Sequence, residues 1–185
     1  MNVRTFQLTA LALCAGLASQ AALAGEHTGW VYNGLLGQAT LHADPIGDSR
    51  FGSNSNIGYR WGALGVEVGH TASFGRFTDS IGSGSRALYL DARVKGWNAG
   101  LDFNHDFSPK WSMQARTGLF AWDAEVRATD SLGVRTSASD SGRDWYAGAS
   151  VDYTHERKSY GLGYTRFKAG DAHMDLWGLH SEFRF

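Results

Sequence analysis

The chain has almost no cysteine and almost no proline. Its 185 residues contain one cysteine, Cys14, and two prolines, Pro45 and Pro109. Because Cys14 lies near the N-terminus, residues 25–185 can form no disulfide and offer no thiolate ligand to a metal. Proline interrupts a β-ladder, and both prolines stand in predicted connections. Long, unbroken strands are therefore possible through most of the sequence.

An excess of positive charge and long apolar runs are also missing. The formal net charge is −1 and no stripe of lysine and arginine occurs, so we predict that nucleic acid is not a partner. After residue 24 no apolar run approaches the roughly twenty residues that a transmembrane helix needs, which excludes a helical membrane protein. The chain instead has 24 glycines and 13% aromatic residues, a composition that favours strands over helices.

The N-terminal segment has the three parts of a secretory signal peptide. Arg4 gives the positive start, Leu8 to Leu17 is an apolar run, and Ala22-Leu23-Ala24 offers small residues for cleavage. A retained anchor helix is the alternative, but the apolar run is too short to cross a bilayer. We predict that residues 1–24 are a signal peptide and that residues 25–185 form one exported domain.

Eight strands can be read in residues 25–185 from alternation with a period of two and from turn residues. Short turns alternate with longer loops, of which Arg127 to Gly142 is the longest and Thr78 to Ser85 is rich in glycine and serine. The expected strands are Gly29–Leu41, Ser53–Trp61, Leu64–His70, Ala87–Phe107, Trp111–Val126, Trp145–Tyr153, Tyr160–Thr165 and Asp175–Phe185.

Most of these strands have one apolar face and one face of polar or small residues. A soluble β-sandwich also alternates, but its inward face is apolar, whereas the second face here is rich in glycine, asparagine, serine, aspartate and arginine. A lipid-facing exterior and a wet interior explain the pattern better. We therefore predict an all-β fold, a membrane-embedded eight-stranded antiparallel up-and-down β-barrel. In its last strand Trp177, Leu179, Phe183 and Phe185 would face lipid, and His180, Glu182 and Arg184 the lumen.

Aromatic residues cluster toward the strand ends, as expected for two interfacial belts. The belt at the short turns would contain Trp30, Tyr32, Tyr59, Trp61, Phe103, Trp111, Tyr153, Tyr160, Phe183 and Phe185. The belt at the longer loops would contain Tyr89, Trp145 and Phe167.

The segments resemble the transmembrane domain of the outer-membrane protein A (OmpA) family. The most specific stretch is GWNAGLDFNHDFSPKWSMQARTGLFAW, residues 96–122, which is similar to the central hairpin of that family. The resemblance implies an eight-stranded barrel without an open channel, its lumen filled by ionised and polar side chains. Glu67, Arg116 and Asp152 match positions of that internal network. The chain departs from the family at Asp102, where a lysine is expected, and at Gly161, where an arginine is expected.

The resemblance also carries expectations for the C-terminus. A terminal phenylalanine such as Phe185, in a strand with Trp177, Leu179 and Phe183, resembles the signal by which the barrel-assembly machinery recognises its substrates. Familiar OmpA proteins carry a peptidoglycan-binding domain after the barrel. Because this sequence stops at the predicted last strand, we do not expect cell-wall tethering.

Charges inside a narrow barrel need partners, because an unpaired buried charge costs several kcal/mol, on the order of 3–5. Glu67 with Arg116 is the favoured pair, and Arg60 or Arg93 could pair with Asp102 and Asp152. Structural filling of the lumen is the first interpretation. The alternative is a gate whose pairs re-form to open a small conductance, and it predicts that Arg116→Ala raises single-channel current. The predicted lumen network is Glu67, Asp102, Arg116, Asp152 and Arg60.

A lipid-modifying enzyme is a further alternative, because serine, histidine and acidic residues occur near the predicted rim. Gly47-Asp48-Ser49 stands in a loop and lacks the strand–turn–helix context that exposes a serine nucleophile. We predict that the protein is not an enzyme and has no catalytic residues. The residues that such an enzyme could use are His42, Asp44, Asp48 and Ser49, and His70 with Ser73.

No metal or cofactor is expected either. The seven histidines show no i, i+2 or i, i+4 pairs, and His173 beside Asp171 and Asp175 is interpreted as a solvated loop cluster. The run Gly82-Ser-Gly-Ser85 lacks the lysine and helix of a phosphate-binding loop.

The sequence thus predicts a small integral protein of the Gram-negative outer membrane with a structural role in the envelope. A small non-specific pore and an adhesin or receptor acting through its outer loops are the alternatives. The expected partners are outer-membrane lipid and lipopolysaccharide, periplasmic chaperones and the barrel-assembly machinery, and the protein is expected to be a monomer.

Overall fold

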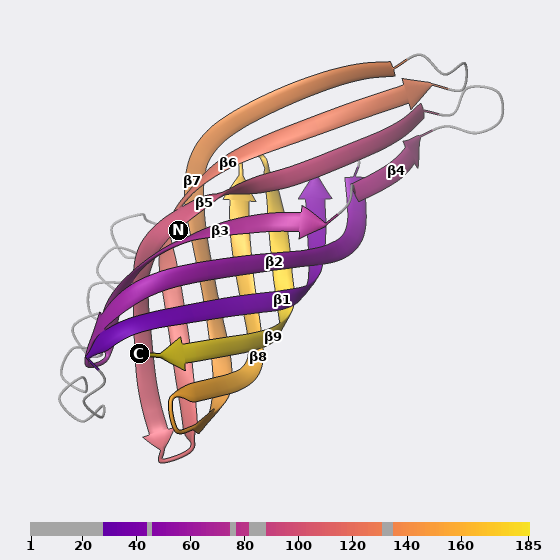
Figure 1. Cartoon of the computed structure of the whole chain (residues 1–185). Helices are drawn as coiled ribbons and strands as arrows, with labels where there is room; N and C mark the ends of the chain where they lie inside the picture. The colour runs from indigo at the N-terminus through magenta and orange to yellow at the C-terminus, as the bar shows by residue number, and fades with distance from the viewer. Residues whose placement is uncertain (1–27, 44–45, 75–76, 82–87, 131–134) are drawn as a thin grey trace, which may run out of the picture.

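The computed structural model describes residues 28–43, 46–74, 77–81, 88–130 and 135–185, and these residues are almost entirely β-strand. The predicted signal peptide, residues 1–24, lies outside the described residues. Among the residues described, no helix is long and apolar enough to cross a membrane. The strands are β1 (Gly29–Ala43), β2 (Ile46–Trp61), β3 (Leu64–Phe74), β4 (Phe77–Ile81), β5 (Leu88–Ser108), β6 (Trp111–Asp130), β7 (Arg135–His155), β8 (Lys158–Ala169) and β9 (Ala172–Arg184) (Figure 1).

The strands close into an antiparallel barrel. Apart from the pair β3 and β4, strands that follow one another in the chain pair side by side. β1 pairs with β9, and β3 pairs with β5, which closes the ring. β4 pairs with β5 beyond the last β3 partner, so β3 and β4 together occupy one of eight positions around the barrel. The predicted eight-stranded up-and-down barrel is confirmed.

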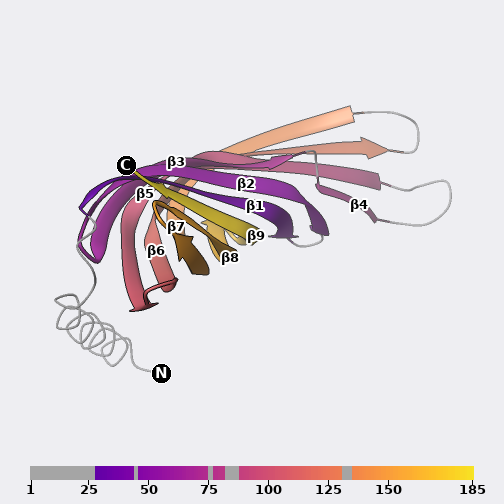
Figure 2. The same cartoon turned by 60° about the horizontal axis from the view of Figure 1, so that its bottom comes forward.

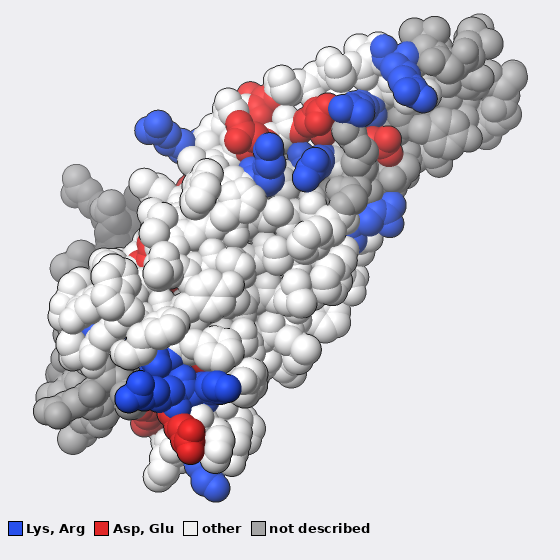
Figure 3. All heavy atoms as spheres, viewed as in Figure 1, with Lys and Arg blue, Asp and Glu red and all other residues white. Residues whose placement is uncertain are grey.

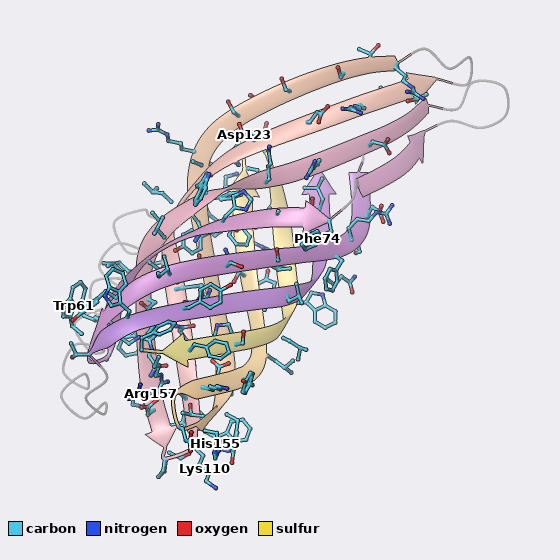
Figure 4. The ribbon with its side chains drawn as sticks, viewed as in Figure 1. Trp61, Phe74, Lys110, Asp123, His155 and Arg157 are labelled. Atoms are coloured by element: carbon cyan, nitrogen blue, oxygen red, sulfur yellow. The ribbon has the colours of Figure 1, made fainter. Side chains whose placement is uncertain are left out.

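The two ends of the barrel differ. The end with the β2–β3, β5–β6 and β7–β8 turns, near Trp61, Lys110 and Arg157, is called the base; it also holds the C-terminus (Figure 4). The opposite end, with the β1–β2 and β8–β9 connections, is called the mouth. Gly62 and Gly170 adopt φ angles of +64° and +61° in their turns, a region that glycine enters without strain.

One side of the mouth continues into a projecting sheet, made of β4 and of residues 88–95, 123–130 and 135–142 of β5, β6 and β7 (Figures 1 and 2). The predicted long loop at 127–142 is therefore wrong: Arg127 pairs with Ser137 and Thr129 with Arg135 in a continuous ladder. The predicted loop at 78–85 is likewise partly strand, because β4 occupies residues 77–81. The sequence pattern missed the extension of β7 because residues 135–141 are exposed on both faces and carry no apolar alternation.

The outer wall carries an apolar girdle between the two charged ends. On the face shown in Figure 3, most charged side chains gather toward the ends and an uncharged band lies between them. Exposed tryptophan, tyrosine and phenylalanine side chains border this band, with Trp61 at the base and Phe74 toward the mouth (Figure 4). Phe167, predicted in the outer belt, is instead 0% exposed and packs inside the barrel; the side chain of Tyr89 is not among those described. The girdle includes Leu36, Ile57, Val66, Val68, Leu101, Met113, Leu119, Val151, Leu162 and Leu179.

The lumen has two zones of opposite character. From the base to mid-height, the inward side chains are charged or polar and buried. Toward the mouth they are apolar, so the expectation of a polar inner face holds only for the half nearer the base. The two ends of β1 illustrate the change: Asn33 faces the polar zone, whereas Leu35, Ala39 and Leu41 face the apolar one. The apolar zone consists of Leu35, Ala39, Leu41, Ala92, Val94, Phe120, Trp122, Tyr146, Phe167, Ala169, Met174 and Leu176.

Candidate functional site in the lumen

Arg60 on β2 organises the charged cluster nearest the base. Its Nε donates to Asp102 Oδ2 at 2.9 Å, and its Nη1 and Nη2 donate to the two carboxylate oxygens of Glu182 at 3.0 and 2.8 Å. All three side chains are at most 3% exposed. Such short hydrogen bonds between ions connect β2 with β5 and β9 inside the lumen.

Two further side chains complete this cluster. Arg184 Nε donates to Glu182 Oε1 at 2.8 Å, and the Gln114 amide donates to both Glu182 and Asp102 at 3.1 and 3.3 Å. Asp102 Oδ1 is buried and has no hydrogen-bond partner among the described residues. A Cβ at Gly65, opposite Asp102 on β3, would overlap this oxygen, so glycine leaves the room that the carboxylate occupies.

Arg116 and His180 form the next layer. Arg116 Nη2 lies 2.9 Å from His180 Nε2, and His180 Nδ1 lies 2.7 Å from Asp152 Oδ1. A guanidinium can only donate, so Nε2 must accept, and the imidazole is assigned as the neutral tautomer with its proton on Nδ1. Asp152 then receives hydrogen bonds from His180 and from the Ser150 hydroxyl. Asp152 was predicted in the lumen charge network, but its partner His180 was not.

Glu67 is bound by neutral donors. Tyr146 Oη donates to Glu67 Oε1 at 2.8 Å and Asn33 Nδ2 donates to Oε2 at 3.3 Å. The expected direct pair of Glu67 with Arg116 is therefore wrong: Arg116 donates to the Asn33 carbonyl at 3.0 Å, so that Asn33 bridges the two. The reason is steric. Tyr146, whose ring stacks on Phe167, and Asn33 already occupy the two carboxylate oxygens of Glu67.

A cluster of asparagines fills the middle of the lumen, and sequence analysis did not single it out. Asn56 donates to Asn33 and Asn54, Asn98 donates to Asn56, and Asn54 donates to Asn98 and Thr71. An amide carries both donors and acceptors, so a ring of amides satisfies itself when water is scarce. The repeated asparagine at inward positions was the available signal.

Trp122 is a buried side chain at the mouth end of the lumen. The Trp122 indole donates to Asp144 Oδ2 at 2.9 Å, and the Gly170 amide donates to the same oxygen at 2.7 Å. Asp144 precedes Trp145, which was predicted in the belt at the longer loops, and lies on the mouth side of it along β7. The hydrogen bond from Gly170 and then that from Trp122 lower the pKa of the Asp144 carboxyl. Below the indole, Phe120 and Phe167 pack with ring centroids 5.0 Å apart.

The five residues predicted for the lumen network all lie inside the barrel and are at most 4% exposed. Arg60, one of the two arginines predicted as partners of the lumen aspartates, forms an ion pair with Asp102. The other, Arg93, lies exposed on the outer wall. Three of the four residues of the predicted assembly signal, Trp177, Leu179 and Phe183, lie on the outer face of β9, and Phe185 follows its last residue. Trp177, Leu179 and Phe185 are exposed and Phe183 is half-buried.

The residues weighed as catalytic are not arranged for nucleophilic catalysis. Ser49 bonds the Thr40 hydroxyl, and Ser73 donates to the Val94 carbonyl. Ser73 points into the lumen, whereas His70 packs on Trp97 on the outer wall. Asp48 forms an ion pair with Arg50, and Asp44 lies outside the described residues. Neither serine bonds a histidine among the residues described.

At the rim, the closure of the barrel brings two histidines together. His42 on β1 stands opposite His173 on β9, and the imidazoles stack with centroids 4.6 Å apart. Their Nε2 atoms lie 3.6 and 3.9 Å from Asp175 Oδ2. The sequence placed His173 and Asp175 together in a loop, but both lie in β9. His42 was missed because it is far from His173 in the chain and only the β1–β9 register joins them.

No protein-family model matches the chain, and no curated protein matches its sequence. Among solved structures, the chain is similar to Ail, the attachment invasion locus protein of Yersinia pestis, with 17% identity and a TM-score of 0.57; the match covers 86% of this chain and 99% of Ail. One Ail crystal structure contains the heparin analogue sucrose octasulfate. Neisserial surface protein A matches with 14% identity and a TM-score of 0.57 over 85% of this chain and 97% of its own. At these identities the comparisons show a shared fold, that of small eight-stranded outer-membrane barrels.

Proposed function

We propose that the chain is an integral protein of the bacterial outer membrane with a structural role in the envelope, and that its lumen is closed to solutes. Buried side chains fill the lumen from Arg60 and Glu182 near the base to Phe120 and Trp122 at the mouth, and this filling is the main support for the proposal. A barrel of eight strands is just wide enough to be filled by side chains.

The outer wall supports the membrane location. Leu119, Leu162 and Leu179 are exposed over 66–69% of their surface, around a wall that carries many other large apolar side chains. A continuous apolar girdle of this kind would be unfavourable in water. A closed barrel also pairs its backbone groups internally, which is the condition for crossing hydrocarbon.

The same surfaces define the partners that we propose. Lipid chains would cover the girdle, and lipopolysaccharide would surround the mouth and the projecting sheet. Periplasmic chaperones would deliver the unfolded chain, and the barrel-assembly machinery would engage Trp177, Leu179 and Phe183 on the outer face of β9 together with the Phe185 that follows it.

Gel mobility tests the membrane barrel. A folded outer-membrane barrel resists dodecyl sulphate at room temperature and unfolds on boiling, so the unboiled protein from an outer-membrane fraction should migrate faster than the boiled one. Identical mobility, or recovery of the protein in the soluble fraction, would contradict the proposal.

Conductance tests the closed lumen. The purified barrel in a planar bilayer should give no resolved single-channel steps. Arg116→Ala removes the donor that links Asn33, Gln114 and His180, so steps that appear only in this variant would identify a gate. Steady conductance of the wild-type protein would favour the small pore.

Recognition of an external surface is the second candidate, and the projecting sheet is the observation that favours it. Arg93 and Lys95 on β5 line a depression of about 480 Å³ together with Asp123, Glu125 and Ser139. The fold is shared with Ail, which has been crystallised with a sulphated heparin analogue. Replacing Arg93 and Lys95 by glutamine should weaken attachment of whole cells to sulphated glycans, while Arg157→Gln at the base should leave it unchanged. Equal attachment by both variants would remove this candidate.

A further inference from the structure

We infer that His42, His173 and Asp175 form a binding site for a divalent transition-metal ion of the zinc class on the outer wall of the barrel, at the rim of the mouth. The three side chains offer two imidazole nitrogens and one carboxylate oxygen, all within 4.8 Å of one another. Such a mixed set of nitrogen and oxygen ligands suits zinc, nickel and copper rather than magnesium or calcium.

The distances are close to those that a metal requires. Metal–ligand bonds of about 2.0–2.1 Å in tetrahedral geometry separate the ligand atoms by about 3.3 Å. The two Nε2 atoms lie 3.6 and 3.9 Å from the same oxygen, Asp175 Oδ2. Contractions of about 0.3 and 0.6 Å would bring these two distances to that value. The two imidazole nitrogens lie within 4.8 Å of each other and would approach as the rings turn out of their stacked arrangement. Because three side chains supply the ligands, a fourth position is left for water.

The backbone fixes the positions of all three ligands. His42 and His173 are direct partners in the β1–β9 register, and Asp175 follows His173 by two residues, so all three point to the same face of the wall. Sites on adjacent strands are held more rigidly than sites on loops, which lowers the entropy lost on binding.

Neighbouring side chains orient the carboxylate but also compete for it. Arg166 donates to both oxygens of Asp175 at 2.7 and 2.8 Å, and the Tyr164 hydroxyl donates to Oδ1 at 2.8 Å. Partners of this kind fix a ligand's orientation in metal sites. Arg166 and Lys168, the register partner of His173, also repel a cation, so we expect weaker binding than at structural zinc sites.

The site would bridge the first and last strands of the barrel. A metal held by His42 on β1 and His173 on β9 therefore clamps the seam where the ring closes. Ligands that bind only the folded state raise its stability, so zinc should raise the urea midpoint of unfolding.

The test is zinc titration by calorimetry on the full barrel in detergent micelles, prepared without a histidine tag. We expect one zinc ion per chain. His42→Gln and His173→Gln should each weaken binding at least about tenfold, because even the loss of an outer-shell partner costs about 10–100-fold. His155→Gln, an exposed histidine at the base, is the matched control and should bind as the wild type does (Figure 4).

Copper gives an independent readout that a merely structural role of the histidines would not change. The electron paramagnetic resonance spectrum of Cu²⁺ bound to the wild type should show hyperfine coupling to two imidazoles, and each single variant should lose one. No saturable zinc binding by the wild type up to about 1 mM would overturn the site. An equal loss in His155→Gln, or unchanged binding in His42→Gln and His173→Gln, would do the same. Heat-modified gel mobility of each variant shows whether the barrel itself has folded, so failure of the site and failure of the fold are distinguishable.

Discussion

Arg60 is the side chain whose replacement should have the largest effect on the polar zone. It makes hydrogen bonds to both Asp102 and Glu182. In Arg60→Met, Glu182 keeps Arg184 and Gln114, whereas Asp102 keeps only the Gln114 amide at 3.3 Å. The other oxygen of Asp102 already lacks a partner among the described residues. The variant therefore leaves a buried carboxylate almost unsatisfied.

The expected cost follows from that arrangement. Removing one partner of a buried ion pair destabilises a protein by about 3–5 kcal/mol, and methionine fills much of the space so that the loss is mainly electrostatic. In Arg60→Met with Asp102→Asn the stranded charge is gone. The double variant should therefore be more stable than the sum of the single effects predicts, with a coupling of about 0.5–3 kcal/mol.

The assay is reversible urea unfolding in lipid vesicles, followed by tryptophan fluorescence and gel mobility. Arg157→Met, at an exposed turn of the base, should lie within about 0.5 kcal/mol of the wild type. An Arg60→Met variant as stable as this control would refute the assignment. Additive effects of the Arg60 and Asp102 substitutions would refute it as well.

Three further predictions concern the rest of the barrel. Leu176→Ala, at a site with 0% exposure in the apolar zone, should lower the free energy of unfolding by about 2–5 kcal/mol in the same urea assay. Gly37→Ala should block closure of the barrel, seen as loss of the fast-migrating gel form, because a Cβ there would overlap the Trp177 carbonyl across the β1–β9 seam. The lowered pKa of Asp144 means that its contribution to stability is fully present above its ordinary pKa of 3.8 and is lost as the pH falls through the lowered value. Acidification to a pH below 3.8 should therefore release the Trp122 indole and shift the fluorescence.

Each of these has a matched control. Leu179→Ala, on the lipid face, should cost less than Leu176→Ala, because lipid chains refill the space. Gly34→Ala should assemble normally, since the nearest atoms to a Cβ there lie 3.7 Å away or more. Asp144→Asn should abolish the acid transition; its persistence would assign the transition to another group. Equal costs for the two leucines, or assembly of Gly37→Ala, would contradict the packing described for those sites.

The barrel and the orientation of its faces follow from the sequence because alternation is a local property. The last strand illustrates this: Leu179 and Phe185 face outward and Glu182 inward, as its period of two requires. Partners inside the lumen are not local. Arg60 and Glu182 are 122 positions apart and meet only because β2 and β9 flank β1 around the ring.

The same limit explains the histidine pair and the length of the strands. His42 and His173 become neighbours through register, which spacing along a chain cannot reveal. The Ser- and Thr-containing segment from Arg135 to Ser141 forms a strand through backbone pairing with β6, although neither face is buried. Patterns of apolar residues report burial, so a strand exposed on both faces gives no signal.

The projecting sheet ends in an open edge. Within the described part of the chain, β8 pairs with β7 only from Tyr146 onward, so residues 135–145 present backbone donors and acceptors on one side. Barrels in the same membrane would hold this edge at a common height and would meet by diffusion in two dimensions. Strand pairing between molecules would therefore be favoured far more than in free solution. Arg135, Asp140 and Arg143 place charges along the edge, and these charges oppose such self-association. Replacing them with small apolar residues should therefore favour pairing between the open edges of neighbouring molecules.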